Sequence, residues 1–347
     1  MTSPILLAVP NVSEGRDAAL IQRIGNAFGH SALGAMAPAA QNARSARASQ
    51  DVEDASEPAD PQTRLLDVHS DADHHRSVVT LVGRAPELAA SLVQGAAAAI
   101  EAIDIVKRAS GAPADAGAHP HVGAIDVIPI VYCDSRARGA ACAEALVVGE
   151  RIGSELGVPV FLYGELAGDT PGRTRAELRR GGVAGLTARM PADTTAEAAG
   201  GRTAAPRPAP LRPDFGPPEP HPSAGATLVA AREPLVAFNL QLQAPASVQD
   251  AHRVAAQIRE GGEHGLPGLR AIGVALSGGV AQVSMNVERP LELPLGEVVR
   301  AVAKLVPVAS AELVGLAPRA AFDGFPAELP LPGFDPDRHL IESALGL

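Results

Sequence analysis

The sequence is poor in aromatic and basic side chains, and both shortages argue against a nucleic-acid partner. Only 3% of its 347 residues are Phe, Tyr or Trp, and Trp is absent, whereas proteins that bind single strands stack bases on aromatic rings. Lys and Arg number 29 against 39 Asp and Glu, a net charge of −10. A nucleic-acid surface would need a basic stripe. A few arginines can still form a local site for a small anion.

Long apolar runs are also missing. No stretch approaches the roughly 20 apolar residues that a membrane span requires. The N-terminal run MTSPILLAVPNVSEG lacks a basic region and is broken by Pro10, so it predicts a first strand rather than a signal peptide. The only cysteines are Cys133 and Cys142, and we interpret them as reduced core residues. We therefore expect a cytoplasmic protein with no membrane segment.

Two segments differ in composition from the rest of the chain, whose composition is typical of a globular protein. Apolar residues make up 46% of the chain, enough for one large or two ordinary domains. Residues 39–64 have almost no large apolar side chain and predict a loose insertion. Residues 188–213 are rich in Pro and Ala and predict a linker. We expect an N-terminal subdomain over residues 1–187 and a C-terminal subdomain over residues 214–347.

Hydrophobic periodicity predicts the same order of elements in both halves. In the first half, strands are predicted at 5–9, 64–68, 77–82, 125–132 and 158–163, with helices at 17–28, 86–106 and 138–156. In the second half, strands are predicted at 234–242, 269–276, 281–287 and 311–316, with helices at 248–260 and 294–305. Each half therefore begins β-α-β-β-α-β, the ferredoxin-like split unit. We predict an α/β (α+β) fold of two such subdomains.

The stretch DVHSDADHHR, Asp67 to Arg76, holds three aspartates, three histidines and an arginine. It lies between two predicted strands and is therefore a loop at a sheet edge. His69, Asp71 and Asp73 alternate as zinc or manganese ligands on a strand would. No HExxH pattern, Cys set or second His/Asp cluster supplies a further ligand. A metal site, a solvated loop and a site for an organic substrate are all open, and the pattern favours the last.

A second candidate is GAHPHVGAIDVIPIV, residues 117–131. Pro120 restricts the backbone of His119 to extended conformations, and Gly123 permits close approach of the backbone to a ligand. Asp126 begins the following strand, where it can orient a histidine or cap the loop. Loops at strand ends often carry catalysis. The alternative is that His119 and His121 are loop histidines bonded to backbone carbonyls.

Two further segments contain polar groups next to glycine and proline. In residues 213–239, backbone amides can form a pocket wall, and Arg232 can bind a carboxylate. The glycines there match neither GxGxxG nor a P-loop, so no nucleotide is expected, and a rigid linker is the alternative. In VPNVSEGRD, Ser13 is predicted to cap the next helix. That leaves Asn11 and Arg16 as candidate ligand groups.

Seven segments, taken together, resemble the formiminotransferase family. They are VPNVSEGRD, HHRSVVTLVG, HPHVGAIDVIPI, GVPVFLYGE, PDFGP, AGATLVAAREPLVAFNLQL and AQVSMNV. Their order and spacing match from near Val9 to near Leu316, apart from the insertion and the linker. The resemblance implies two α/β subdomains with folate in a cleft between them, in a homodimer.

The resemblance also implies an activity. A formimino group would be transferred between N-formimino-L-glutamate and tetrahydrofolate, a step of histidine degradation and one-carbon metabolism. Tetrahydrofolate would be a co-substrate, no metal is implied, and the partners would be small molecules. We expect no counterpart of the cyclodeaminase domain that is fused to the family in animals.

The resemblance places the catalytic histidine, within the motif HP-x-x-G-A-x-D, at His119. A group that titrates near neutrality can take a proton from the attacking pteridine N5 and return one to the leaving amine. Relatives have Asp-Val-Asp before the catalytic loop, whereas this chain has Asp67-Val68-His69. Either Asp71 replaces the missing acid or His69 itself carries the proton.

The resemblance further implies a folate-lining segment from Gly216 to Gly225 and arginine partners for glutamate carboxylates. Arg76 and Arg232 are the candidates, with Arg173 as a weaker one. The complete predicted binding set is Asn11, Arg76, Gly123, Asp126, Gly216, Pro217, Ser223, Ala224, Gly225, Arg232 and Asn239. The alternatives are a folate or pterin binder without transfer, transfer of a formyl group, and a metal hydrolase.

Overall fold

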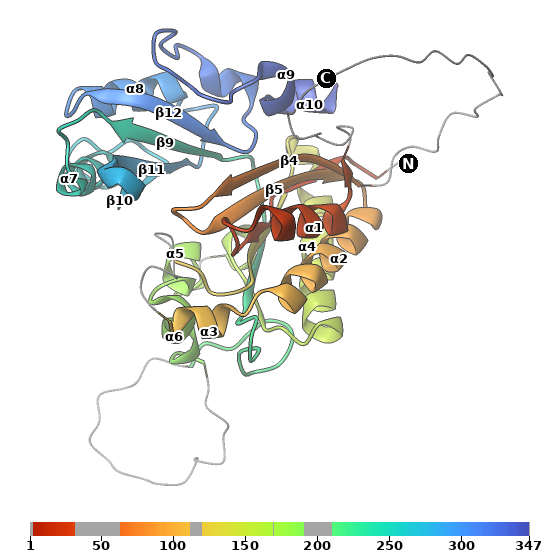
Figure 1. Ribbon diagram of the computed structural model, residues 1–347. Coiled ribbons are helices and arrows are strands. Elements are labelled where there is room, and N and C mark those ends of the chain that lie inside the picture. Colours follow the sequence, from red (N-terminus) through yellow and green to blue (C-terminus); the bar gives the residue numbers. More distant parts are fainter. Residues whose placement is uncertain (1–2, 32–62, 112–119, 169, 191–209, 347) are drawn as a thin grey trace, which may run out of the picture.

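The computed structural model describes residues 3–31, 63–111, 120–168, 170–190 and 210–346. These residues form two units, each a sheet covered by helices on its outer face (Figure 1). Most of the predicted insertion and linker, and the predicted catalytic His119, lie outside the described residues.

The first unit has an eight-stranded sheet. Its strands are β1 (Leu6–Ala8), β2 (Asn11–Val12), β3 (His30–Ser31), β4 (Arg64–Asp71), β5 (Arg76–Gly83), β6 (Ile125–Val131), β7 (Val160–Leu162) and β8 (Thr227–Arg232). Its helices are α1 (Ala18–Phe28), α2 (Glu87–Ala102), α3 (Ile105–Ala109), α4 (Arg138–Glu155), α5 (Arg175–Leu178) and α6 (Gly182–Thr187). Within the sheet, β4-β5-β1-β6 is the predicted split unit, and β8 and β7 extend it in parallel beyond β6.

The second unit has a four-stranded sheet in the order β10-β11-β9-β12. Its strands are β9 (Val236–Leu242), β10 (Leu269–Ala275), β11 (Ala281–Val287) and β12 (Val308–Val314), and its helices are α7 (Val248–Ile258), α8 (Leu295–Ala303), α9 (Pro336–His339) and α10 (Ile341–Leu345). Within the described residues, short 3₁₀ turns lie at Ser135–Ala137 and Gly164–Leu166 of the first unit, and at Ser277–Gly279 and Arg319–Phe322 of the second. The chain order β9-α7-β10-β11-α8-β12 confirms the predicted ferredoxin-like unit.

The division between the sheets falls later than the predicted linker. Residues 227–232 follow that linker, yet β8 pairs with β6 and β7 of the first sheet. The second sheet starts at β9, after the short connection 233–235. The apolar run TLVAAR is therefore a buried strand of the first unit and not part of a connection into the second.

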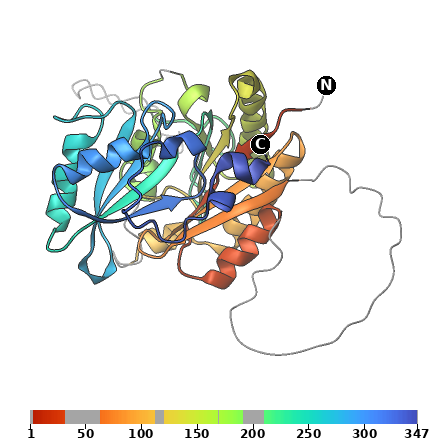
Figure 2. The same cartoon turned by 90° about the horizontal axis from the view of Figure 1, so that it is seen from above.

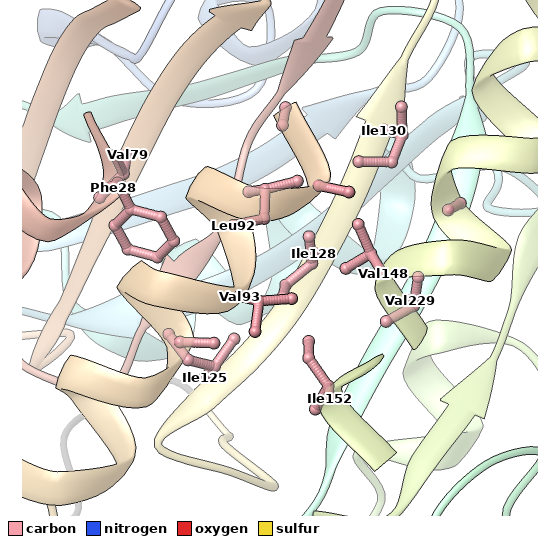
Figure 3. Packing of buried hydrophobic residues seen from close by; sticks show 14 of the residues in the cluster. Phe28, Val79, Leu92, Val93, Ile125, Ile128, Ile130, Val148, Ile152 and Val229 are labelled. Atoms are coloured by element: carbon pink, nitrogen blue, oxygen red, sulfur yellow. The ribbon is translucent and has the colours of Figure 1, made fainter. Parts of the chain in front are cut away.

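Alternation along the central strand separates a helix-covered face from an open one. On β6, Ile128 and Ile130 pack with Leu92 of α2 and Val148 of α4 in the main core (Figure 3). Each such fully buried side chain contributes about 1.5–3 kcal/mol. The intervening Val127, Pro129 and Val131 face the second sheet and line a cleft there. Figure 2 shows the two sheets side by side from above.

Three local predictions are corrected by the structure. Asp17, not Ser13, caps α1, because its side chain accepts from the backbone N–H of Leu20. The predicted helix 86–106 is interrupted, since α2 ends at Ala102 and Asp104 caps the separate α3. Cys133 is exposed and Cys142 half-buried, so neither is a fully buried core residue; both are free thiols.

None of the helices in the described part of the chain is long and apolar enough to cross a membrane.

Candidate functional site

A cleft opens between the two sheets. Its empty volume is about 750 Å³, including space open to solvent. Its walls combine apolar residues of the first sheet with residues of the second, among them Val78, Val127, Val131, Ala237, Asn286 and Val314. Concave sites with apolar walls and a few polar groups are typical of small-molecule binding.

Four arginines line this cleft. Arg76 begins β5, Arg175 begins α5, Arg179 directly follows α5, and Arg232 ends β8. Of the four, only Arg179 forms an ion pair within the described residues, and its partner is Asp126. Arg76, Arg175 and Arg232 leave their charges uncompensated by any carboxylate contact in the same part of the chain. The cleft is therefore an electropositive site.

Burial affects the protonation of these guanidinium groups. Burial, together with the charge of Arg179, lowers the pKa of Arg76 to about 10. Burial likewise lowers the pKa of Arg232 to about 10 and lowers that of Arg175. Because a pKa of about 10 still leaves arginine protonated at neutral pH, the cleft attracts anions without losing its charge.

Asp126 holds the loop before β6 in place. Its carboxylate is fully buried, accepts a bond of 2.8 Å from the backbone N–H of Val122, and pairs with Arg179. Gly123 in the same loop forms a bridge with Gly225, and a Cβ there would lie 1.9 Å from the carbonyl oxygen of Ala226. The close approach at Gly123 is thus to the protein's own backbone.

His121 is buried beside the same charges. Its Nδ1 lies 3.1 Å from the Ser13 hydroxyl, which donates to the carbonyl of Gly123 at 2.6 Å. Burial lowers the pKa of His121 to about 4; Arg179 and Arg76 add to this effect, while Asp126 opposes it. His121 is therefore neutral at pH 7.

The side chain of Asp71 closes the β4–β5 hairpin. Its carboxylate accepts from the backbone N–H of His74 at 2.8 Å and lies 2.5 Å from Nδ1 of the same residue. Burial alone would raise the pKa of Asp71, but the contacts with His74 outweigh it and lower the pKa to about 2.

His69 contacts the second unit. Its Nε2 lies 3.2 Å from Oε1 of Glu312 on β12, and Oε2 of Glu312 accepts from the side-chain amide of Asn239 at 2.8 Å. Burial acts to raise the pKa of Glu312, yet His69 and Asn239 bring it below its usual value. In the hairpin loop, Asp73 accepts from the backbone and hydroxyl of Ser277 at 3.1 Å. The stretch that suggested a metal site is therefore a junction between the units.

The comparisons with known proteins identify the family. The formiminotransferase domain, N-terminal subdomain, matches residues 5–232. A glutamate formimidoyltransferase of Streptococcus pyogenes serotype M1 is 34% identical over 292 residues, 82% of this chain and 89% of that protein. One of Thermoplasma acidophilum is 31% identical over 335 residues, 94% and 93% of the two chains.

The chain belongs to the formiminotransferase family.

Some relatives are longer. The formimidoyltransferase-cyclodeaminase of Sus scrofa is 34% identical over 330 residues, which are 92% of this chain and 51% of that protein. The chain thus spans about half the length of that relative.

The formiminotransferase structure brings some of the predicted residues together. Asn11, Arg76 and Arg232 line the cleft. Asp126 pairs with Arg179, which also lines the cleft. Asn239 instead donates to Glu312 at the junction between the units. The catalytic role of His119 and the binding roles of these residues stay predictions.

The predicted folate-lining loop lies elsewhere, at the edge of the first sheet. A Cβ at Gly216 would approach Val158 and Gly153 of the α4–β7 region, and the carbonyl of Ser223 accepts from Ile105 of α3. His221 Nδ1 accepts from the backbone N–H of Ala224 at 3.0 Å. Among the described residues that line the cleft, none belongs to the loop from Gly216 to Gly225.

Sequence reasoning missed Arg175, Arg179 and Glu312. The two arginines are four residues apart in TRAELRRGG, a spacing that places side chains on one side of a helical turn. That spacing was a usable signal. Glu312 on β12 carried none, because only the packing of the two units brings it to His69.

The described residues hold no group of three His, Cys, Asp or Glu side chains arranged to bind a metal ion.

Proposed function

We propose that this chain is a glutamate formimidoyltransferase, which transfers the formimino group between N-formimino-L-glutamate and tetrahydrofolate. The observation that carries the proposal is the cleft with three arginines that make no carboxylate contact among the described residues, in a member of this family. Both substrates carry glutamate carboxylates, which guanidinium groups bind in charge-assisted pairs. Tetrahydrofolate acts as a co-substrate, and no resident metal is part of the proposal.

The transfer requires a tetrahedral adduct and two proton movements. N5 of the pteridine attacks the formimino carbon, and the C–N bond to glutamate then breaks. N5 loses a proton and the departing amine gains one, so one acid–base group serves both steps. We assign this role to His119. His121 is unsuited to it, because a pKa of about 4 makes it a weak base at neutral pH.

Support for the catalytic loop comes from two places. Asp126 and Arg179 fix the base of the loop from within the first unit. Because Asp71 is held by His74, we propose that His69 and Glu312 together stand in for the acid that relatives have at this strand. In this arrangement the carboxylate comes from the second unit.

The proposed localisation rests on the sequence, and the proposed assembly rests on the family resemblance. We propose a cytoplasmic homodimer that binds neither nucleic acid nor membrane. The net charge of −10 and the scarcity of aromatic residues support the absence of a nucleic-acid partner.

The test offers two donors to the purified protein with tetrahydrofolate: N-formimino-L-glutamate and N-formyl-L-glutamate. We expect equal amounts of glutamate and 5-formiminotetrahydrofolate, with kcat/KM for the formimino donor at least tenfold higher. Tetrahydrofolate binding without transfer from either donor would make the chain a binding protein. Preference for the formyl donor would make it a formyltransferase.

A further inference from the structure

The loop of residues 13–17 joins β2 to α1 and contacts both chain segments that flank residues 112–119. Residues 112–119 end with His119 and lie between α3 and β6 in the sequence. We call the flanking segments stems: the first is residues 105–111, which begin with α3, and the second is residues 120–124, which lead into β6. The transfer proposed above assigns no role to the 13–17 loop, although this loop touches both stems.

Ser13 holds the second stem in place. Its hydroxyl donates to the carbonyl oxygen of Gly123 at 2.6 Å and lies 3.1 Å from Nδ1 of His121. The backbone N–H of Ser13 also donates to the carbonyl oxygen of Ala124 at 2.9 Å. Because Ser13 is fully buried, water does not compete for these contacts. The second stem is therefore fixed against the 13–17 loop.

Arg108 of α3 holds the first stem to the same loop. Its guanidinium donates to the carbonyl oxygen of Ser13, and another of its N–H groups lies 2.9 Å from Oε2 of Glu14. At the start of α3, the backbone N–H of Ile105 donates to the carbonyl oxygen of Ser223 at 2.9 Å. Two adjacent residues, Ser13 and Glu14, thus contact both stems.

Glu14 is a nearly buried carboxylate with both oxygens bonded. Its Oε1 accepts from the backbone N–H groups of residues 15–17 at 2.8 to 3.1 Å, and its Oε2 accepts from Arg108. Burial acts to raise the pKa of Glu14, but two of these backbone bonds, with His75 and Arg108, lower it below its usual value. The carboxylate is therefore charged at neutral pH, and the 13–17 loop folds around it.

The 13–17 loop also meets the β4–β5 hairpin that carries Arg76. The hydroxyl of Ser77 donates to the carbonyl oxygen of Glu14 at 2.6 Å. A Cβ at Gly15 would lie 2.5 Å from the backbone nitrogen of Arg76, so the two backbones are in close contact. Since Arg76 lines the cleft, one loop connects both stems to a wall of the cleft.

We propose that Glu14 is a positioning residue of the transfer: with Ser13 and Arg108 it fixes the two stems relative to each other, and thereby places His119. The inference rests on the proposed function, in which His119 is the acid–base group. Neither Glu14 nor Arg108 is among the described residues that line the cleft, so both act through other residues. Misplacement of a catalytic group by about 1 Å can reduce the rate about a hundredfold.

Glu144 provides a matched control, because it is a carboxylate with the same burial. Glu144 and Glu14 are each 4% exposed, and each accepts from backbone N–H groups. The donor to Glu144 is Ala89, so its contact joins α4 to α2 and involves neither stem. Glu144→Gln therefore reports what the loss of a buried carboxylate does without any effect on the stems.

The experiment compares the wild type with Glu14→Gln, Arg108→Gln, the double variant and Glu144→Gln. Steady-state kinetics with N-formimino-L-glutamate and tetrahydrofolate give kcat and KM. Hydrogen exchange of the ligand-free proteins, followed by mass spectrometry, reports separately on the two stems. Arg108→Gln keeps the backbone bonds of Glu14, so it carries the test alone if Glu14→Gln does not fold.

We expect Glu14→Gln and Arg108→Gln each to lower kcat by about tenfold or more while KM stays within about twofold. The double variant should lose less than the product of the two single losses, because both substitutions remove the same ion pair. Exchange should accelerate in both stems of these variants by about tenfold. In Glu144→Gln, kcat and the exchange of the stems should stay at the wild-type level.

Unchanged exchange in both stems of Glu14→Gln and Arg108→Gln would overturn the inference, whatever the transferase assay shows. A rise in KM with unchanged kcat would also overturn it, because these residues would then act on substrate binding. So would an equal loss of kcat in Glu144→Gln, which would make the effect one of general stability. If the wild type transfers no formimino group, the proposed function fails, and faster exchange confined to the two stem variants would still support the contacts that fix the stems.

Discussion

At the scale of single residues, the Asp126–Arg179 ion pair anchors the loop before β6. The carboxylate is fully buried, and both of its oxygens are engaged. We expect Asp126→Asn to lower the free energy of unfolding by about 3–5 kcal/mol, because Arg179 keeps a buried charge without its partner. Chemical denaturation measures this change.

An exposed pair provides the control for that substitution. Glu155→Gln removes the partner of Arg151 on the surface of α4 and should leave the unfolding free energy nearly unchanged. Equal losses in the two variants would show that burial of Asp126 has no energetic consequence.

His121 predicts a pH dependence of stability. The pKa of His121 falls from 6.5 to about 4 on folding. Between these pH values the imidazole is protonated in the unfolded chain and neutral in the folded chain. The stabilisation is complete above pH 6.5 and is lost as pH falls towards 4, by about 3 kcal/mol in all. His75, whose pKa is also lowered, mainly by burial, acts in the same direction.

Equilibrium unfolding between pH 7 and 5 tests this, a range above the pKa of about 2 for Asp71. His121→Gln should give a shallower fall in unfolding free energy than the wild type. A variant with the same slope as the wild type would show that His121 titrates normally in the folded chain.

At the scale of elements, Gly123 is where the loop before β6 meets the segment before β8. A Cβ would lie 1.9 Å from the carbonyl oxygen of Ala226, a backbone atom that cannot move aside alone. We expect Gly123→Ala to destabilise the chain by about 1–3 kcal/mol and to reduce transfer. Thermal unfolding and the transfer assay measure both effects.

Gly139 near the start of α4 is the matched control, because a Cβ there meets nothing within 4 Å. Gly139→Ala should leave stability unchanged or raise it by up to about 1 kcal/mol. If Gly123→Ala behaved in the same way, the close contact with Ala226 would have no consequence.

Local patterns predicted most elements but not their distant partners. The continuous apolar run of β6 and the helical patterns of α4 and α7 follow from which side chains must be buried, and these elements were predicted correctly. The strand β8 was missed because glycines and prolines precede it and its stabilisation comes from pairing with β6, about a hundred residues earlier. Ser13 was misassigned as a cap, since its contact with His121 is equally distant.

At the scale of the whole molecule, the β4–β5 hairpin joins the two units beside the cleft. Glu312→Ala should lower the free energy of unfolding by about 1–3 kcal/mol, because the nearly buried amide of Asn239 loses its acceptor. Since Val314 on the same strand lines the cleft, KM for the substrates should rise as well. Denaturation and steady-state kinetics measure the two effects.

Asp73→Ala is the comparison, because its contact with Ser277 also joins the units but is exposed. It should change stability and KM less. If Asp73→Ala lowered the free energy of unfolding and raised KM more than Glu312→Ala, the contact that stabilises the junction between the units would lie at the hairpin tip instead.

The candidate site was predictable only where a motif carried it. Arg76 and Arg232 were found from the sequence, yet nothing local showed that they line the same cleft. That arrangement depends on the register of four strands. The replacement of an acid by His69 was visible in the sequence, whereas the carboxylate of Glu312 that faces it became visible only in the folded chain.

The most direct test compares the wild type with His119→Ala. For each protein, the affinity for tetrahydrofolate and the turnover of N-formimino-L-glutamate are measured on the same preparation. The account predicts that the variant loses turnover by about 10²–10⁴-fold while its affinity for tetrahydrofolate stays within twofold. Undiminished turnover in His119→Ala would contradict the catalytic assignment, and no turnover by the wild type would contradict the function itself.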